Sequence, residues 1–193
     1  TASIQVTVNA TKGTLQVATS VPGGITTVPD NGTNTVTLVG TLAAINATLA
    51  DPNGLQYTPN ANANGVEDLT VVANDLGNLG GTNQPATDTK IVRITIAAVN
   101  DAPQVTVPAV QPLEVDEDAI LTSFGVAVAD VDATEGTGLV RVTATVGNGT
   151  LTVSTQVPNG VPPNQILNNG SNSLTMTGTP AQLNATLTGD ATR

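Results

Sequence analysis

Apolar and polar residues alternate with a period of two over several short stretches of this chain. In residues 4–8 (IQVTV) and 140–144 (VRVTA) the apolar side chains fall on alternate positions, which predicts β-strands with one buried face. Similar short runs predict strands at residues 14–17, 36–39, 69–73, 91–96, 126–129, 151–153 and 174–176. Asn-Gly pairs at 31–32, 53–54, 64–65, 148–149, 159–160 and 169–170 are expected to supply the positive φ of tight turns.

Two segments replace this alternation with a helical pattern. In residues 41–49 (TLAAINATL) the first Thr can cap a helix whose apolar residues share one face. Residues 179–187 (TPAQLNATL) start with a Thr-Pro pair that suits the cap and the first helical position. Many short strands with regular turns, and one short helix in each group, predict an all-β fold of Greek-key β-sandwiches.

The two helices belong to two copies of an internal repeat. Residues 30–49 (DNGTNTVTLVGTLAAINATL) match residues 168–187 (NNGSNSLTMTGTPAQLNATL), so Gly40 corresponds to Gly178. Nearer the start of the copies, Thr14 corresponds to Thr150. The period is therefore about 136 to 138 residues, and the 193 residues hold less than two copies. We expect one repeat at residues 1–100 that lacks its first strands, and the next at 101–193 that lacks its last strands.

Composition argues against catalysis and against binding of nucleic acids. The chain has 15 acidic and 5 basic residues, no His and no Cys, which removes the usual dyads, thiol nucleophiles and zinc sites. Five scattered cations cannot form a basic surface for phosphates. No apolar run approaches the ~20 residues that cross a bilayer. We therefore expect no enzyme, no nucleic-acid partner and no membrane insertion in this segment.

Several motifs resemble those of one protein family. The NDAP run at residues 100–103, with the two strands before it, resembles the end and linker of a cadherin-type repeat. VDEDA at residues 115–119 resembles the acidic motif on the first strand of such a repeat, and VADVDATEG at 128–136 is similar to its DxD loop. With YTPNAN at residues 57–62 and the short helix, the chain resembles the cadherin-like tandem repeats of large bacterial surface adhesins.

This resemblance implies a function and a location. It implies cadherin/Ig-like β-sandwich repeats stacked end to end, stiffened by Ca²⁺ at each junction, in the stalk of an extracellular cell-surface protein for adhesion or biofilm formation. The partners would be neighbouring repeats of the same chain, and also identical chains or cell-surface ligands. Two alternatives stay open: a self-associating module that forms an extracellular fibre or matrix, and a carbohydrate-binding module. The scarcity of aromatic residues, Tyr57 and Phe124 alone, weakens the carbohydrate alternative.

Acidic residues are concentrated after the NDAP linker. Seven of the 15 lie between positions 114 and 135, namely Glu114, Asp116, Glu117, Asp118, Asp130, Asp132 and Glu135. Clustered carboxylates repel one another unless a cation joins them or water solvates them, so a solvated surface run remains the alternative. Ca²⁺ prefers six to eight oxygen ligands from several segments. We assign Asn100, Asp101, Asp130 and Asp132 to one junctional Ca²⁺ site.

The resemblance adds two further candidate ligands. Glu117 matches the acid of the first strand, and Asp75 matches an acid at the near end of the first copy. Both would bind Ca²⁺ at neighbouring junctions. The acidic motif expected before the penultimate strand has no clear counterpart, because Asn60, Asn62, Asn64, Glu67 and Asp68 occupy that region. Fewer ions at each junction are therefore expected.

Overall fold

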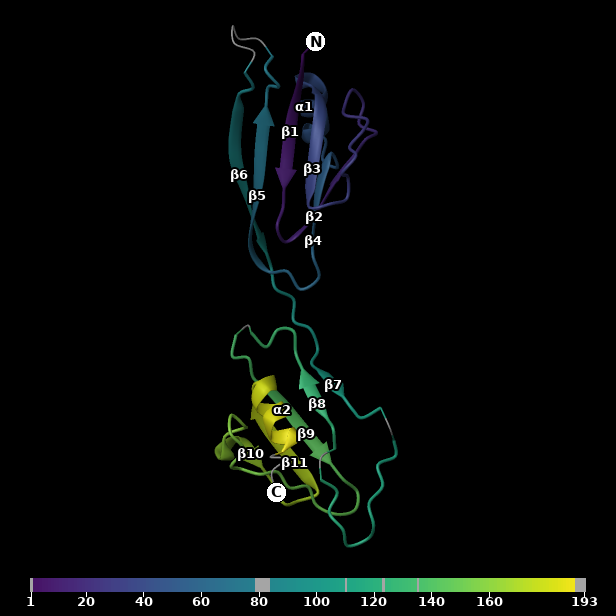
Figure 1. Cartoon of the computed structure of the whole chain (residues 1–193), viewed down its shortest axis with the longest axis vertical. Helices are drawn as coiled ribbons and strands as arrows, with labels where there is room; N and C mark the ends of the chain where they lie inside the picture. Colours follow the sequence, from purple (N-terminus) through teal and green to yellow (C-terminus); the bar gives the residue numbers. More distant parts are fainter. Residues whose placement is uncertain (1, 79–83, 110, 123, 135, 190–193) are drawn as a thin grey trace. The chain divides into compact units, whose positions relative to one another are not determined.

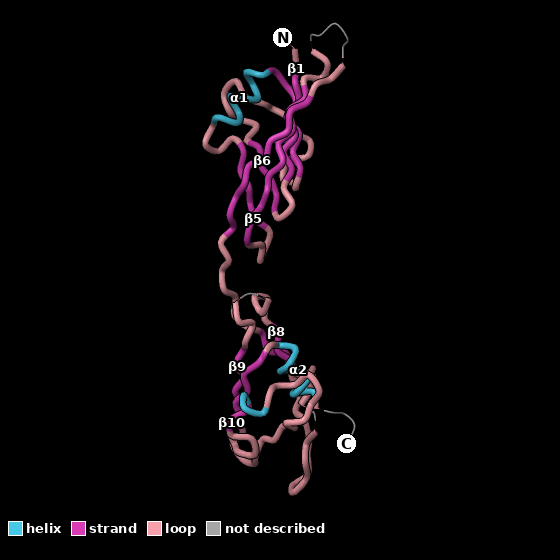
Figure 2. Tube along the Cα trace, turned by 90° about the vertical axis from the view of Figure 1, so that its left-hand side faces the viewer, coloured by secondary structure: helices cyan, strands magenta, loops and turns pink. Residues whose placement is uncertain are grey.

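The computed structural model describes residues 2–78, 84–109, 111–122, 124–134 and 136–189. The chain divides into two compact units, Thr1–Val99 (unit 1) and Asn100–Arg193 (unit 2). Over the described residues the regular elements are mostly β-strands in antiparallel sheets, with two short α-helices (Figure 1). This confirms the mostly-β fold that the alternating pattern predicts. The helices appear as short cyan segments among strands and loops (Figure 2).

Unit 1 contains a four-stranded sheet and a two-stranded sheet. The larger sheet has the order β3-β1-β5-β6, and the smaller one pairs β2 with β4. Their bounds are β1 Ser3–Asn9, β2 Gly13–Val17, β3 Thr35–Thr41, β4 Leu55–Pro59, β5 Gly65–Asn74 and β6 Thr87–Ile96. Helix α1, Leu42–Ala50, follows β3 directly, with the Thr41 hydroxyl accepting the Ala44 N–H at 3.1 Å.

The core of unit 1 is aliphatic. Val6 and Val8 of β1 are buried on one face of the sheet, as the period of two predicts. Leu15 of β2, Leu38 of β3 and Ile45 of α1 are fully buried in the same cluster. Each such side chain stabilises the unit by about 1.5–3 kcal/mol relative to an exposed one. The core therefore depends on Val, Ile and Leu.

Unit 2 repeats part of this plan. Strand β9 (Val140–Thr145) pairs with β11 (Ser173–Gly178), β11 pairs with β10 (Ile166–Leu167), and β7 (Gln104–Thr106) pairs with β8 (Ala127–Ala129). A 3-10 turn, η1 (Pro163–Gln165), precedes β10, and α2 (Pro180–Thr188) follows β11. Thr179 and Gln182 form a capping box at the start of α2. In the described part of the chain, neither helix is long and apolar enough to span a membrane.

In each unit, an asparagine side chain makes hydrogen bonds with both the N–H and the carbonyl of one valine, at corresponding positions of the repeat. Asn31 Oδ1 accepts the Val17 N–H at 2.7 Å, and its Nδ2 donates to the Val17 carbonyl at 2.8 Å. Asn169 makes the same two bonds with Val153, both at 2.9 Å. The repeat in the sequence is thus accompanied by a repeat of specific contacts.

A buried threonine makes a second shared contact. Thr48 Oγ1 accepts the Ile25 N–H at 2.7 Å, and Thr186 Oγ1 accepts the Val161 N–H at 2.8 Å. Both hydroxyls lie on the inner face of their helix. A Cβ atom at Gly160 would lie 2.8 Å from Thr186 Oγ1, so glycine permits this close approach of loop and helix.

The structure differs from the sequence predictions in several places. Residues 151–153 form a single bridge, Leu151 to Ser171, and no strand. Strands β4, β7 and β10 have no counterpart among the predicted runs. At the Asn-Gly pair 53–54, Gly54 has no positive φ; its Cβ would lie 1.6 Å from the Thr48 carbonyl oxygen. At the pair 159–160, Asn159 takes the positive φ (57°) instead of the glycine.

Candidate functional site

The DxD motif forms a tight turn directly after β8. Asp130 Oδ1 accepts the Asp132 N–H at 2.9 Å, and the Asp130 carbonyl accepts the Ala133 N–H at 3.3 Å. Aspartate favours such turns because its short carboxylate reaches the backbone two residues on. Both Asp130 and Asp132 are half-buried. The turn therefore holds two carboxylates within one short segment.

The start of unit 2 lies against this turn. The Asp101 N–H donates to Asp132 Oδ2 at 2.5 Å, across 31 positions in the sequence. Asn100 Nδ2 donates to the Asp101 carbonyl at 3.1 Å. The backbone of the NDAP segment and the DxD turn are thus neighbours, as the assignment of Asn100, Asp101, Asp130 and Asp132 to one site requires.

The ligand set around this turn is partial. Over the residues that the structure describes, no three His, Cys, Asp or Glu side chains are grouped so that they could hold a metal ion. Asp130 and Asp132 each use one oxygen for a backbone N–H. The second oxygens of these two carboxylates are of the kind that suits Ca²⁺, whereas the hydrogen bonds of Asn100 and Asp101 in this region are one from the Asn100 amide to the Asp101 carbonyl and one from the Asp101 backbone N–H. Glu135, another acid of this region, lies outside the described residues.

Asp75 has a structural role at the end of β5. Its Oδ1 accepts the Ala86 N–H at 2.7 Å and the Gly77 N–H at 2.9 Å, and its own N–H donates to the Ala86 carbonyl at 3.1 Å. These backbone bonds, that from Ala86 foremost, lower the pKa of the Asp75 carboxyl and outweigh the opposing effect of desolvation. The carboxylate therefore ties the two strands of the β5–β6 connection together.

Glu117 lies on an exposed turn, and not on the strand that the resemblance implies. The Ala119 N–H donates to the Asp116 carbonyl at 3.2 Å across this turn, and Asp118 has a positive φ of 66°. Asp75 belongs to unit 1 and Glu117 to unit 2. Within unit 2, as far as the structure describes it, Glu117 makes no hydrogen bond with the Asp130–Asp132 turn.

Glu67 is a fully buried carboxylate that the sequence analysis did not select as a site residue. Its Oε1 accepts the Thr11 N–H at 2.9 Å, and its Oε2 accepts the Lys12 N–H at 2.5 Å and the Tyr57 hydroxyl at 3.4 Å. The Lys12 ammonium donates to the Asn64 carbonyl at 2.8 Å beside it. A sequence signal exists: Glu67 lies two positions before buried Leu69, and this places both side chains on the inner face of β5.

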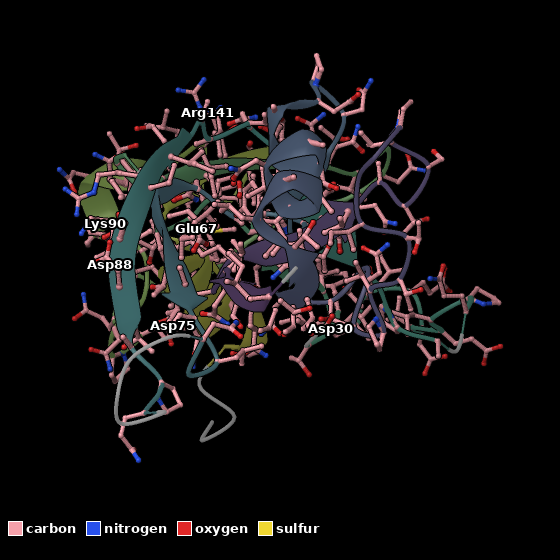
Figure 3. The ribbon with its side chains drawn as sticks, turned by 90° about the horizontal axis from the view of Figure 1, so that it is seen from above. Asp30, Glu67, Asp75, Asp88, Lys90 and Arg141 are labelled. Carbon is pink, nitrogen blue, oxygen red and sulfur yellow. The ribbon has the colours of Figure 1, made fainter. Side chains whose placement is uncertain are left out.

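Burial and hydrogen bonding act in opposite directions on Glu67. Loss of solvation raises the pKa of the Glu67 carboxyl, but the N–H groups of Thr11 and Lys12 and the neighbouring hydroxyls together hold its pKa below the usual value. The carboxylate thus remains charged inside unit 1. Figure 3 shows Glu67 in the interior, whereas Asp88 and Lys90 lie along the outer strand β6. The Glu67 carboxylate fixes the turn between β1 and β2 through its bonds with the Thr11 and Lys12 N–H groups.

Comparison with models of known families, with curated proteins and with solved structures gave no match. The interpretation of the candidate site is therefore based on the residues of this chain and their contacts.

Proposed function

We propose that the chain is part of the stalk of a large extracellular, cell-surface adhesion protein, in which tandem repeats serve as spacers. Each repeat would be a cadherin/Ig-like β-sandwich with Greek-key connections, and Ca²⁺ would stiffen the junctions between neighbouring repeats. The resemblance to cadherin-like repeats of bacterial adhesins, in the NDAP run and the DxD motif, points in the same direction.

The observation that carries the proposal is the recurrence of the same contacts in two units. The Asn31 and Asn169 side chains bind corresponding backbone positions, and so do the Thr48 and Thr186 hydroxyls. Arrays of such units gain stability from internal contacts and from neighbours. A protein built from copies of one rigid unit is suited to set a distance, and this is what a stalk requires.

The NDAP segment and the DxD turn support the calcium part of the proposal. The Asp101 backbone contacts the Asp132 carboxylate, so the segment that enters unit 2 and the acidic turn share one location. A cation there would relieve the repulsion between Asp101, Asp130 and Asp132. It would also fix the entering segment to unit 2, so that a junction becomes stiffer when the ion binds.

Small-angle scattering of the purified chain, with Ca²⁺ and with EGTA, tests this function. A spacer should stay monomeric, and its scattering curve should change to that of a stiffer molecule when Ca²⁺ is added. The double variant Asp130→Asn, Asp132→Asn should scatter like the EGTA sample in both conditions. If the scattering curve of the unaltered chain is the same with and without Ca²⁺, the proposal of a calcium-dependent stalk is wrong.

Self-association into a fibre is the second candidate function, and β6 favours it. This strand lies at the edge of its sheet, and Ile91 and Val92 are 60% and 51% exposed. An exposed strand edge can pair with another chain. The strand also carries exposed Lys90 and Arg93, paired with Asp88 and Asp68, and charges of this kind oppose edge pairing. Sedimentation at micromolar concentration distinguishes a monomer from filaments.

We assign the chain no catalytic role and no carbohydrate site. The sequence offers no His or Cys for acid–base or nucleophilic chemistry. Sugar sites commonly use exposed aromatic rings, and one of the two aromatic residues, Tyr57, is only partly exposed and packs against the core of unit 1.

A further inference from the structure

Helix α2 holds strand β8 through one asparagine. Asn184 Oδ1 accepts the Val128 N–H at 2.7 Å, and Asn184 Nδ2 donates to the Val128 carbonyl at 2.8 Å. The Val128 side chain is only 3% exposed, in a core cluster whose other buried members lie between Val140 and Leu183. Figure 2 shows α2 and β8 close together in this unit. Both the backbone and the side chain of Val128 are thus fixed by the second half of unit 2.

Strand β7 lies along the other edge of β8. Val105 of β7 is opposite Val128, at the centre of a pairing of three residues on each strand. In an antiparallel pair, the backbone groups of successive residues point alternately toward the partner strand and away from it. The Val128 N–H and carbonyl, which bind Asn184, therefore point away from β7. Strand β8 is held between helix α2 and the segment that enters unit 2.

The acidic turn follows β8 directly. Asp130 lies two positions after Val128, and its carboxylate accepts the Asp132 N–H at 2.9 Å. The Asp132 carboxylate in turn accepts the Asp101 N–H at 2.5 Å. The entering segment is therefore bound at two places by residues 127–132, through the pairing of β7 with β8 and through the bond of Asp101 with Asp132. A displacement of β8 would move both of these contacts.

We propose that Asn184 is a positioning residue for the acidic turn. Its amide fixes Val128, and the backbone of β8 then sets the place of Asp130 and Asp132 relative to Asp101. The inference rests on the proposed function in one respect, because it takes this turn as the place where Ca²⁺ binds. Residues that orient metal ligands from behind commonly change metal affinity by about 10–100-fold when they are replaced. Asn184 acts through the backbone of β8 and is not itself a ligand.

The test is Asn184→Ala in the whole 193-residue chain, which removes both bonds with Val128. One readout is the position of the Asp101 and Asp132 backbone amide signals in NMR spectra recorded in EGTA. The other is the Kd for Ca²⁺ from titration calorimetry, at a temperature where all the variants are folded. We expect both amide signals to shift in Asn184→Ala, and the Kd to rise by about tenfold or more.

The matched control is Thr186→Val on the same helix. It breaks the bond between the Thr186 hydroxyl and the Val161 N–H and leaves the contact with β8 in place. It should lower the stability of unit 2 as well, but the two amide signals and the Kd should stay as in the unaltered chain. Asn184→Asp keeps an acceptor for the Val128 N–H and loses the donor to its carbonyl, so its effects should be intermediate. This variant carries the test if Asn184→Ala does not fold.

Three results separate the possible failures. Amide signals that stay in place in Asn184→Ala, or that shift equally in Thr186→Val, would overturn the proposal, since Asn184 would then contribute to stability alone. An equal Kd of the unaltered chain and Asn184→Ala would also overturn it, while leaving a calcium site at the turn. If the unaltered chain binds no Ca²⁺, the proposed function fails, and the spectra in EGTA decide by themselves whether Asn184 positions the turn.

Discussion

The Glu67 carboxylate accepts the Lys12 N–H at 2.5 Å, and this bond joins an inward position of β5 to the turn between β1 and β2. The Thr11 N–H and the Tyr57 hydroxyl also donate to this carboxylate, so hydrogen bonds stabilise its buried negative charge. Removing the charge while keeping the shape should therefore weaken unit 1.

Glu67→Gln should make the stability of unit 1 less dependent on pH. The pKa of Glu67 is lowered in the folded protein from the usual 4.5. Its contribution is therefore present above pH 4.5 and is lost as the pH falls through the folded pKa. The variant should melt below the unaltered chain at neutral pH, and the difference should narrow under acid. Circular dichroism melts from pH 7 to about pH 3 measure this, with exposed Glu114→Gln as the control. A difference that stays constant with pH would contradict the charged state of Glu67.

Thr48→Val and Thr186→Val should destabilise unit 1 and unit 2 respectively. Each change keeps the volume but leaves the N–H of Ile25 or Val161 without its acceptor. An unsatisfied buried N–H costs about 1–3 kcal/mol. Denaturant titration followed by NMR signals from each unit measures both effects. The exposed Thr58→Val serves as the control. Equal stability of either buried variant and the control would refute the shared role of the two hydroxyls.

Gly54→Ala should destabilise unit 1 strongly. The added Cβ would lie 1.6 Å from the Thr48 carbonyl oxygen, so the backbone must move, at a cost of about 3 kcal/mol or more. Gly147→Ala is the matched control, because no described atom lies within 4 Å of its added Cβ, and its effect should stay within about 0.5 kcal/mol. Calorimetry of both variants gives the comparison. A tolerated Gly54→Ala would show that the helix and the following turn are packed less closely.

Asn184→Ala and Asn46→Ala should differ although their positions correspond. Asn184 makes two bonds with Val128, each of which contributes about 0.5–1.5 kcal/mol. Its loss should lower the free energy of unfolding of unit 2 by about 1–3 kcal/mol. Exposed Asn46 should change unit 1 by less than about 0.5 kcal/mol. Hydrogen exchange at the Val128 amide offers a direct readout, and unchanged protection in Asn184→Ala would refute the anchoring of β8.

Alternation of apolar and polar residues predicts a strand correctly only where a neighbouring strand is present to form the backbone hydrogen bonds. Residues 4–8 lie within β1 because β3 and β5 flank it. Residues 151–153 have the same alternation, but they form only the Leu151–Ser171 bridge. The corresponding residues of unit 1 lie in β2 because β4 pairs with them, and no described strand pairs with residues 151–153 in this way. Strand β4 is short and ends in Pro59, so its pairing with β2 depends on tertiary contacts.

The candidate site could be predicted only in part. The DxD spacing and the NDAP run identify segments that do lie together, at Asp101 and Asp132. Sequence spacing could not reveal that Asp75 is engaged by backbone N–H groups, or that Glu117 lies on a turn. The sequence marks Glu67 only as an acid in a region without the expected motif. That the Glu67 side chain points inward can be predicted, because Glu67 lies two positions before Leu69 on the same strand. Its hydrogen bonds with the β1–β2 turn could not be predicted from the sequence, because the fold brings that turn to β5.

The most direct test of the account is the thermal stability of unit 2 with Ca²⁺ and with EGTA, in the unaltered chain and in the double variant Asp130→Asn, Asp132→Asn. An ion that binds only the folded state stabilises it by about 2.7 kcal/mol at 100 times its Kd. The account predicts a rise in Tm with Ca²⁺ in the unaltered chain and little or none in the double variant. A Tm that is the same with Ca²⁺ and EGTA in the unaltered chain, or an equal rise in both proteins, would contradict a calcium site at this turn.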